Sequence, residues 1–83
     1  MFDSENQLFE NLAIKHMDKV YSKAIRLAGS TEAAEGLVQQ TYEVAYWRFE
    51  HFDKKADFEK WLIGILIFIW ASACFQEPLI AEG

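Results

Sequence analysis

Polar groups suited to a protein contact stand close together in the stretch 34–42. Six residues there could take part in such a contact: Glu35, Leu37, Val38, Gln39, Gln40 and Thr41. Carboxylate and amide side chains can exchange hydrogen bonds with a charged partner, while the apolar side chains exclude water from the contact. The pattern is compatible with a partner-binding helix, but the periodicity by itself favours an ordinary amphipathic helix.

A second group combines aromatic rings with lysines. Its members are Phe52, Lys54, Lys55, Lys60 and Trp61. An exposed ring can stack on an unpaired base and lysines can meet phosphates, which is the combination that single-stranded nucleic acid requires. The alternative is a solvated loop in which Phe49 and Phe52 fold onto the core.

Residues for catalysis or metal binding form no recognisable motif. His16 and His51 lie far apart, and neither belongs to a Cys, Asp or Glu arrangement with metal-ligand spacing. Cys74 is the single cysteine, no serine sits in a nucleophile elbow, and no glycine-rich loop precedes a helix. We therefore expect no enzyme, no cofactor and no metal site.

Helix signals begin near the N-terminus. Ser4–Gln7 has the form of a capping box, which predicts the start of a first helix, and Gly29 is a natural stop for it. Ser30 or Thr31 can cap a second helix.

A third helix is expected from Asp57, a plausible cap, to Pro78. Its stretch 61–75 carries no charged residue, so apolar side chains face every direction and two short helices can hardly cover them. With 15 residues this stretch is shorter than the ~20 that a bilayer needs, and we expect no membrane contact. The sequence predicts one all-α domain over 1–83, a three-helix or four-helix bundle with an aromatic-rich core, which self-associates through 61–75.

The charge balance limits any binding of nucleic acid. Thirteen acidic and eight basic residues give a net charge of −5, and the basic residues end at Lys60. Because affinity for nucleic acid comes largely from neutralising phosphates, any DNA contact must be local. One cysteine and an N-terminus without a basic start and apolar run favour a cytoplasmic location.

Two strings in the sequence carry a resemblance to a known family. AEGLVQQTY at 34–42 and DFEKWL at 57–62 resemble region 2 of the extracytoplasmic-function (ECF) sigma factors, in the sigma-70 superfamily. The resemblance is strongest over 8–65, whereas 66–83 diverges. It implies a helical bundle of the sigma region 2 type and a role in bacterial transcription initiation. A full family member would carry a second helical domain, so we expect region 2 alone, excised or separately encoded.

The resemblance also assigns roles to the two groups of residues described above. It implies that the helix surface from Glu35 to Thr41 docks on the clamp helices of the largest subunit of RNA polymerase core. It implies that the loop at 49–56 receives a flipped base of the minus-ten promoter element, with Phe52 stacking on it. Gly36 and Gln40 replace the usual acidic residues and Val44 replaces a common arginine, which weakens the expected core contact.

The departure after Leu62 leaves three functions open. In the family this helix bears arginine, asparagine and aspartate residues that read and melt the minus-ten element, whereas here 63–75 is apolar. The first possibility is a sigma region 2 domain that binds polymerase core and binds promoter DNA weakly, with a preference for single strands. The second is a regulatory mimic that binds an anti-sigma factor or polymerase without reading DNA. The third is a helical oligomerisation domain.

Overall fold

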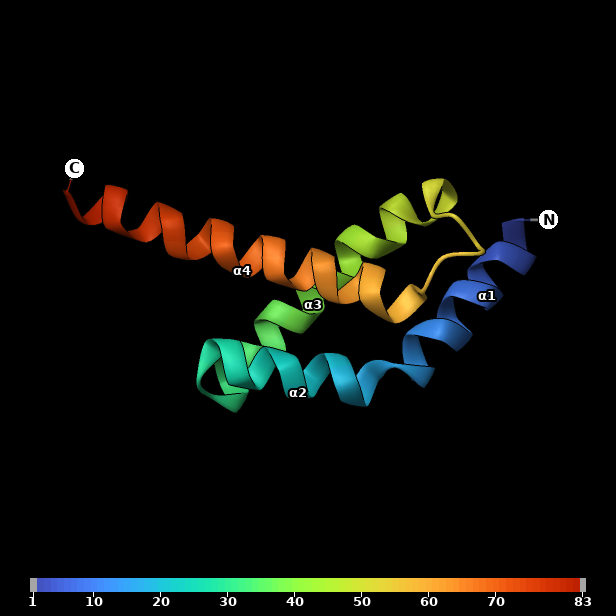
Figure 1. Ribbon diagram of the computed structural model, residues 1–83, viewed down its shortest axis with the longest axis horizontal. Coiled ribbons are helices and arrows are strands. Elements are labelled where there is room, and N and C mark those ends of the chain that lie inside the picture. The colour runs from blue at the N-terminus through green and yellow to red at the C-terminus, as the bar shows by residue number, and fades with distance from the viewer. Residues whose placement is uncertain (1, 83) are drawn as a thin grey trace.

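The computed structural model describes the backbone of residues 2–82 and the side chains of residues 6–74, and this part of the chain is helical with short connections (Figure 1). Its elements are α1 (Phe2–Lys15), α2 (Met17–Ala28), α3 (Thr31–Arg48), the short 3₁₀ helix η1 (Phe49–His51) and α4 (Phe58–Glu82). The expected all-α bundle is confirmed, in its four-helix form.

The first expected helix is divided at His16. This residue has φ −105° and ψ 8°, outside the α-helical range. The amides of His16 and Val20 still reach the carbonyls four residues back, at 3.2 and 3.1 Å, so the chain bends without unwinding. The cause is tertiary, because the His16 ring packs 5.7 Å from the ring of Phe58 in α4. The expected start is also wrong in detail, since α1 already begins at Phe2.

The turn between α2 and α3 follows from two neighbouring residues. Gly29 has φ 88°, a left-handed conformation that glycine adopts without strain, and its amide donates to the Ile25 carbonyl at 2.8 Å. The Ser30 hydroxyl accepts a hydrogen bond from the Ala33 amide at 3.2 Å. Both the expected stop at Gly29 and the cap at Ser30 are confirmed.

Aromatic side chains fill one end of the core. Phe9 of α1, Phe49 of η1 and Phe58 of α4 are all buried, and their ring centroids lie 5.1 to 6.1 Å apart with edge-to-face geometry. Edge-to-face pairs place the positive ring edge against the negative ring face, which stabilises them beyond their area burial. The aromatic-rich core expected from the composition is confirmed.

The first half of α4 packs against α2 and α3. Asp57 caps its start, with a carboxylate oxygen 3.2 Å from the Lys60 amide. Leu62 and Leu66 are completely buried, whereas Phe68 is 68% exposed. Burial of one stripe of α4 thus leaves apolar residues on its other side in contact with solvent.

The second half of α4 runs out beyond the other helices (Figure 1). The helix continues past Pro78 to Glu82, so the expected end at Pro78 is wrong. A proline inside a helix removes one backbone hydrogen bond and favours a bend, and it does not always terminate the helix. Across the described residues, no helix combines the length and the apolar character that crossing a membrane requires.

Tyr42 ties α3 to α1, because its hydroxyl donates to the Ala13 carbonyl at 3.0 Å. Burial raises the pKa of Tyr42 to about 12, from 10.0. A raised pKa favours the neutral phenol in the fold, so this contribution to stability is complete below pH 10 and is lost between pH 10 and about 12. In an ultraviolet titration we expect Tyr42→Phe to remove the last of the three tyrosine ionisations. If Tyr42→Phe removed the ionisation at the lowest pH instead, the assignment of the highest tyrosine pKa to Tyr42 would be contradicted.

Candidate functional site

The polar surface of α3 contains half of the residues first considered for a partner contact. Glu35, Gln39 and Gln40 are exposed and lie on the solvent side of the helix. Leu37 and Val38 are only 8% and 7% exposed because they pack in the core. The α3 polar face is therefore defined as Glu35, Gln39 and Gln40.

Thr41 also belongs to the interior. It is completely buried, and its hydroxyl donates to the Leu37 carbonyl at 2.8 Å. A direct contact of Leu37, Val38 or Thr41 with a partner would require the core to open, so the sequence expectation is corrected for these three residues. Leu37, Val38 and Thr41 are spaced one and three positions apart, so they lie on one face of the helix. Glu35 and Gln39 lie on a different face.

Glu35 affects the ionisation of Tyr21 in the neighbouring helix. The pKa of Tyr21 in α2 is raised, first by burial and then by a hydrogen bond to Glu35 and the charge of its carboxylate. Glu35 therefore lies close to Tyr21 of α2 while remaining exposed.

A groove beside the α3 polar face was not expected from the sequence. Gly36, Gln39 and Gln40 line one side, and Ile69 and Trp70 of α4 line the other. A Cβ atom on Gly36 would meet nothing within 4 Å, so the missing side chain leaves the groove open. The signal in the sequence was the uncharged stretch of α4, which predicted an uncovered surface without locating it.

Phe52 is not available to stack on a base. It is 7% exposed, it stacks on Phe49 with 15° between the ring planes, and its centroid lies 4.6 Å from that of Trp61. The alternative, in which Phe49 and Phe52 fold onto the core, is confirmed. Trp61 is half-buried in the same cluster.

Lys54 has a structural role in the loop. Its ammonium group donates to the carbonyls of Phe49 and Phe52 at 3.2 and 3.3 Å, and it lies 4.4 Å from the centre of the Phe49 ring. These contacts hold the loop against the end of η1 and compete with a phosphate for the same charge. Lys54, Lys55 and Lys60 are all exposed, and Lys54 differs from the other two by these contacts with backbone carbonyls.

Lys60 and Trp61 lie beside a second, largely apolar groove. It runs between α3 and α4 and is also lined by Arg48 and Phe68. Arg48 was missed by the sequence reasoning, because the end of the second helix is blurred by a run of aromatic residues. The structure thus places Arg48 and Lys60 on one groove and leaves Lys55 on the loop.

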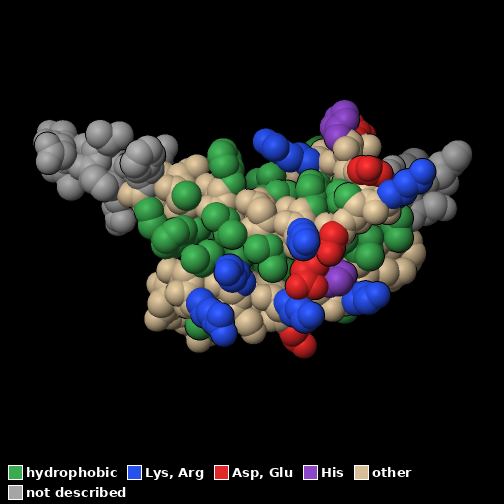
Figure 2. Space-filling model, viewed as in Figure 1, with side chains coloured by type: hydrophobic (Ala, Val, Ile, Leu, Met, Phe, Trp, Pro, Cys, Tyr) green, Lys and Arg blue, Asp and Glu red, His purple; other side chains and the backbone are tan. Residues whose placement is uncertain are grey.

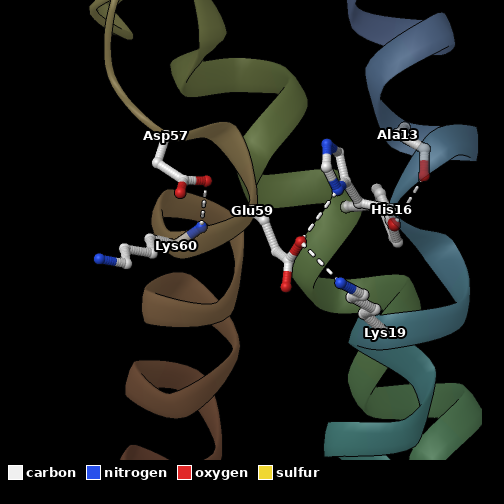
Figure 3. A network of polar contacts seen from close by, with 7 residues as sticks. Ala13, His16, Lys19, Asp57, Glu59 and Lys60 are labelled. Carbon is white, nitrogen blue, oxygen red and sulfur yellow. Dashed lines mark hydrogen bonds and ion pairs between the residues drawn. The ribbon is translucent and has the colours of Figure 1, made fainter.

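A polar network joins the bend at His16 to the start of α4 (Figure 3). Glu59 lies 3.2 Å from His16 Nδ1 and 3.8 Å from Lys19 Nζ. One carboxylate thereby connects α2 to the turn that carries Lys60 and Trp61. Within the residues described, no group of three or more His, Cys, Asp or Glu side chains could hold a metal ion.

Comparison with known proteins decides the family. The family model for sigma-70 region 2 matches residues 12–74, well over half of the chain. The chain belongs to the sigma-70 region 2 family. No curated protein and no solved structure matches it. The family match begins in α1 and ends in α4, so it includes the α3 polar face and the loop at 49–56.

Membership of the sigma-70 region 2 family gives the general function. Domains of this family are non-enzymatic parts of sigma factors that act in binding RNA polymerase core and in promoter recognition. The four-helix fold of the structure is consistent with this family.

Proposed function

We propose that this chain is region 2 of an ECF-type sigma factor, which binds the clamp helices of RNA polymerase core through the α3 polar face. The observation that carries the proposal is the exposure of Glu35, Gln39 and Gln40 inside the family match. A carboxylate and two amides can pair with arginine side chains on a partner, and charge-assisted hydrogen bonds of this kind are the strong ones. We further propose that the domain acts in the cytoplasm, where the polymerase is found.

The groove beside the α3 polar face adds apolar area to the proposed contact. Ile69 and Trp70 on its far wall are half-buried, so a partner that covers them would remove further apolar surface from water. Tryptophan is enriched among the residues that dominate binding energy at interfaces. In this proposal the apolar half of α4 therefore assists polymerase binding, where the rest of the family uses its helix for DNA.

The proposed DNA contact of the loop is reduced to few residues. Lys55 and Lys60 can reach phosphates, with the half-buried Trp61 beside Lys60. Two lysines in a chain of net charge −5 support weak binding, and single strands bend more easily around such a small site than duplex does.

A regulatory mimic is the second candidate. The observation that favours it is the absence of any lysine or arginine after Lys60, together with the net charge of −5. Such a protein would bind polymerase core or an anti-sigma factor and would not help to hold open DNA.

A gel-shift experiment with a bubble-containing promoter DNA separates the two candidates. If the chain is a sigma region 2 domain, we expect core polymerase to retain the bubble DNA much better when the chain is added. If the chain is a regulatory mimic, we expect it to bind core polymerase without increasing the retention of DNA. A premelted bubble removes the need to know the cognate promoter sequence.

We also propose that the domain self-associates through the exposed side of α4, at 61–75. Phe68 is 68% exposed, and a symmetric dimer would bury it twice, at roughly 1.5–3 kcal/mol each. We expect Phe68→Ser to raise the dimer dissociation constant about a hundredfold or more in analytical ultracentrifugation. Trp47→Ser is the matched control, because Trp47 of α3 is 74% exposed. A clean monomer of the unaltered chain at high micromolar concentration would refute the proposal.

A further inference from the structure

The basic residues of this acidic protein are unevenly distributed. Four of the eight lie between residues 15 and 26, namely Lys15, Lys19, Lys23 and Arg26, and Asp18 is the single acidic residue in that segment. The segment therefore carries a net charge of +3, from four positive charges and one negative, in a chain of −5. A local excess of this kind creates a positive field at one surface even where the whole molecule is negative.

Three of these residues, Lys19, Lys23 and Arg26, lie on one side of α2, and Lys15 is the last residue of α1, just before the bend. The spacings of four and three positions within α2 place Lys19, Lys23 and Arg26 on neighbouring turns of one face. The opposite side of α2 carries Val20 and Ala24, which are completely buried. Figure 2 shows a row of lysine and arginine side chains over α2, below the hydrophobic band of α4. We call the four basic residues the α2 basic face.

The α2 basic face borders a groove against the start of α4. Asp18, Lys19, Ser22, Lys23 and Arg26 line it from α2, and Glu59 and Ile63 line it from α4. Glu59 is directed to His16 and Lys19 in the network described above. Among the described side chains, no carboxylate lies within ion-pair distance of Lys23 or Arg26, so these two charges are available to an anionic partner.

The dimensions of the face fit a nucleic-acid strand. From Lys19 to Arg26 the helix rises about 10 Å at 1.5 Å per residue. One strand of a duplex presents a phosphate about every 3.4 Å along its axis, so several phosphates span the same length. The Ser22 hydroxyl adds a donor of the kind that commonly contacts phosphate oxygens.

From this geometry we propose that the α2 basic face binds the phosphate backbone of nucleic acid without reading its sequence. The inference deepens the proposed function, since it names a surface that holds promoter DNA after α4 has lost its basic residues. Lys23 and Arg26 carry the contact most directly, with Lys15 and Lys19 at the end nearer the bend. The loop lysines Lys55 and Lys60 then act as a separate, smaller site.

Fluorescence anisotropy with a labelled single-stranded oligonucleotide tests the inference on the full chain. Each phosphate contact contributes roughly 0.7 to the slope of log affinity against log salt. Lys23→Gln with Arg26→Gln should therefore make the slope shallower by about 1.4. Between 200 and 20 mM salt, the affinity of the unaltered chain should then rise about 25-fold more than that of the variant. An unchanged slope, or no binding by the unaltered chain at the lowest salt, overturns the inference.

Two further measurements distinguish the α2 basic face from a general charge effect and from a membrane-binding surface. Arg48→Gln with Lys55→Gln is a control that removes the same two positive charges from exposed residues outside the face, and it should lower the slope by no more than one contact. Vesicles containing anionic phosphatidylserine test a membrane surface as the partner; binding to vesicles and not to the oligonucleotide overturns the inference. If core polymerase fails to bind the chain but the change in slope persists, the proposed polymerase contact fails and the nucleic-acid face stands.

Discussion

Reversing the charge character of the α3 polar face, by Glu35→Lys with Gln39→Lys, should lower the affinity for RNA polymerase core at least about a hundredfold. Each lost hydrogen bond to a charged group costs about 1.5–3 kcal/mol, and 1.4 kcal/mol is a factor of ten in affinity. The two new lysines would also face the arginine-rich partner surface proposed above, which adds repulsion. Helical content should be unchanged, because both side chains are exposed.

A matched control exists on α1. Gln7 and Glu10 are exposed and lie outside the α3 polar face. Gln7→Lys with Glu10→Lys changes the same residue types and the same charge, so it should leave core binding nearly unaltered. Equal loss in the two double variants would mean that net charge, and not this surface, governs binding. Undiminished binding of the α3 variant would remove the assignment.

The second large effect concerns stability. Leu66 is completely buried in α4, and Leu66→Ala should lower the free energy of unfolding by about 2–5 kcal/mol. A small domain has only about 5–15 kcal/mol in total, so the variant should unfold at a much lower urea concentration. The cost combines lost transfer energy with a cavity that neighbouring helices cannot collapse to fill.

Ile67→Ala is the control for Leu66→Ala, because the adjacent side chain is 41% exposed. Its removal should cost clearly less. The comparison should be made at low protein concentration, where self-association through α4 contributes little to the measured stability. A similar loss in both variants would show that Leu66 does not occupy the core as described.

Local signals in the sequence predicted the helix ends that depend on local chemistry. Gly29, Ser30 and Asp57 act within three or four residues of their own position, through a left-handed turn or a cap. The bend at His16 could not be predicted in this way, since it depends on Phe58, which lies 42 positions further along the chain (58 − 16). Tertiary contacts of this kind are invisible to periodicity alone.

The candidate site was only partly predictable for a related reason. A family motif reads as a continuous string, but a helix divides that string between its two sides. Leu37 and Thr41 therefore went into the core while Gln39 and Gln40 stayed outside, a division that the spacing of the apolar residues already indicated. The role of Lys54 could not be predicted from the sequence, because its contacts with two backbone carbonyls depend on the conformation of the loop.

Binding of polymerase core through α3 is the main function proposed for this small acidic domain of the sigma-70 region 2 family. Titration of the labelled chain with purified RNA polymerase core is its decisive test, with an unlabelled full-length sigma factor as competitor. We expect saturable binding that the competitor displaces and that Glu35→Lys with Gln39→Lys abolishes. Absence of saturable binding, or binding that a full-length sigma factor leaves undisturbed, would show that this chain does not occupy the sigma site on the polymerase.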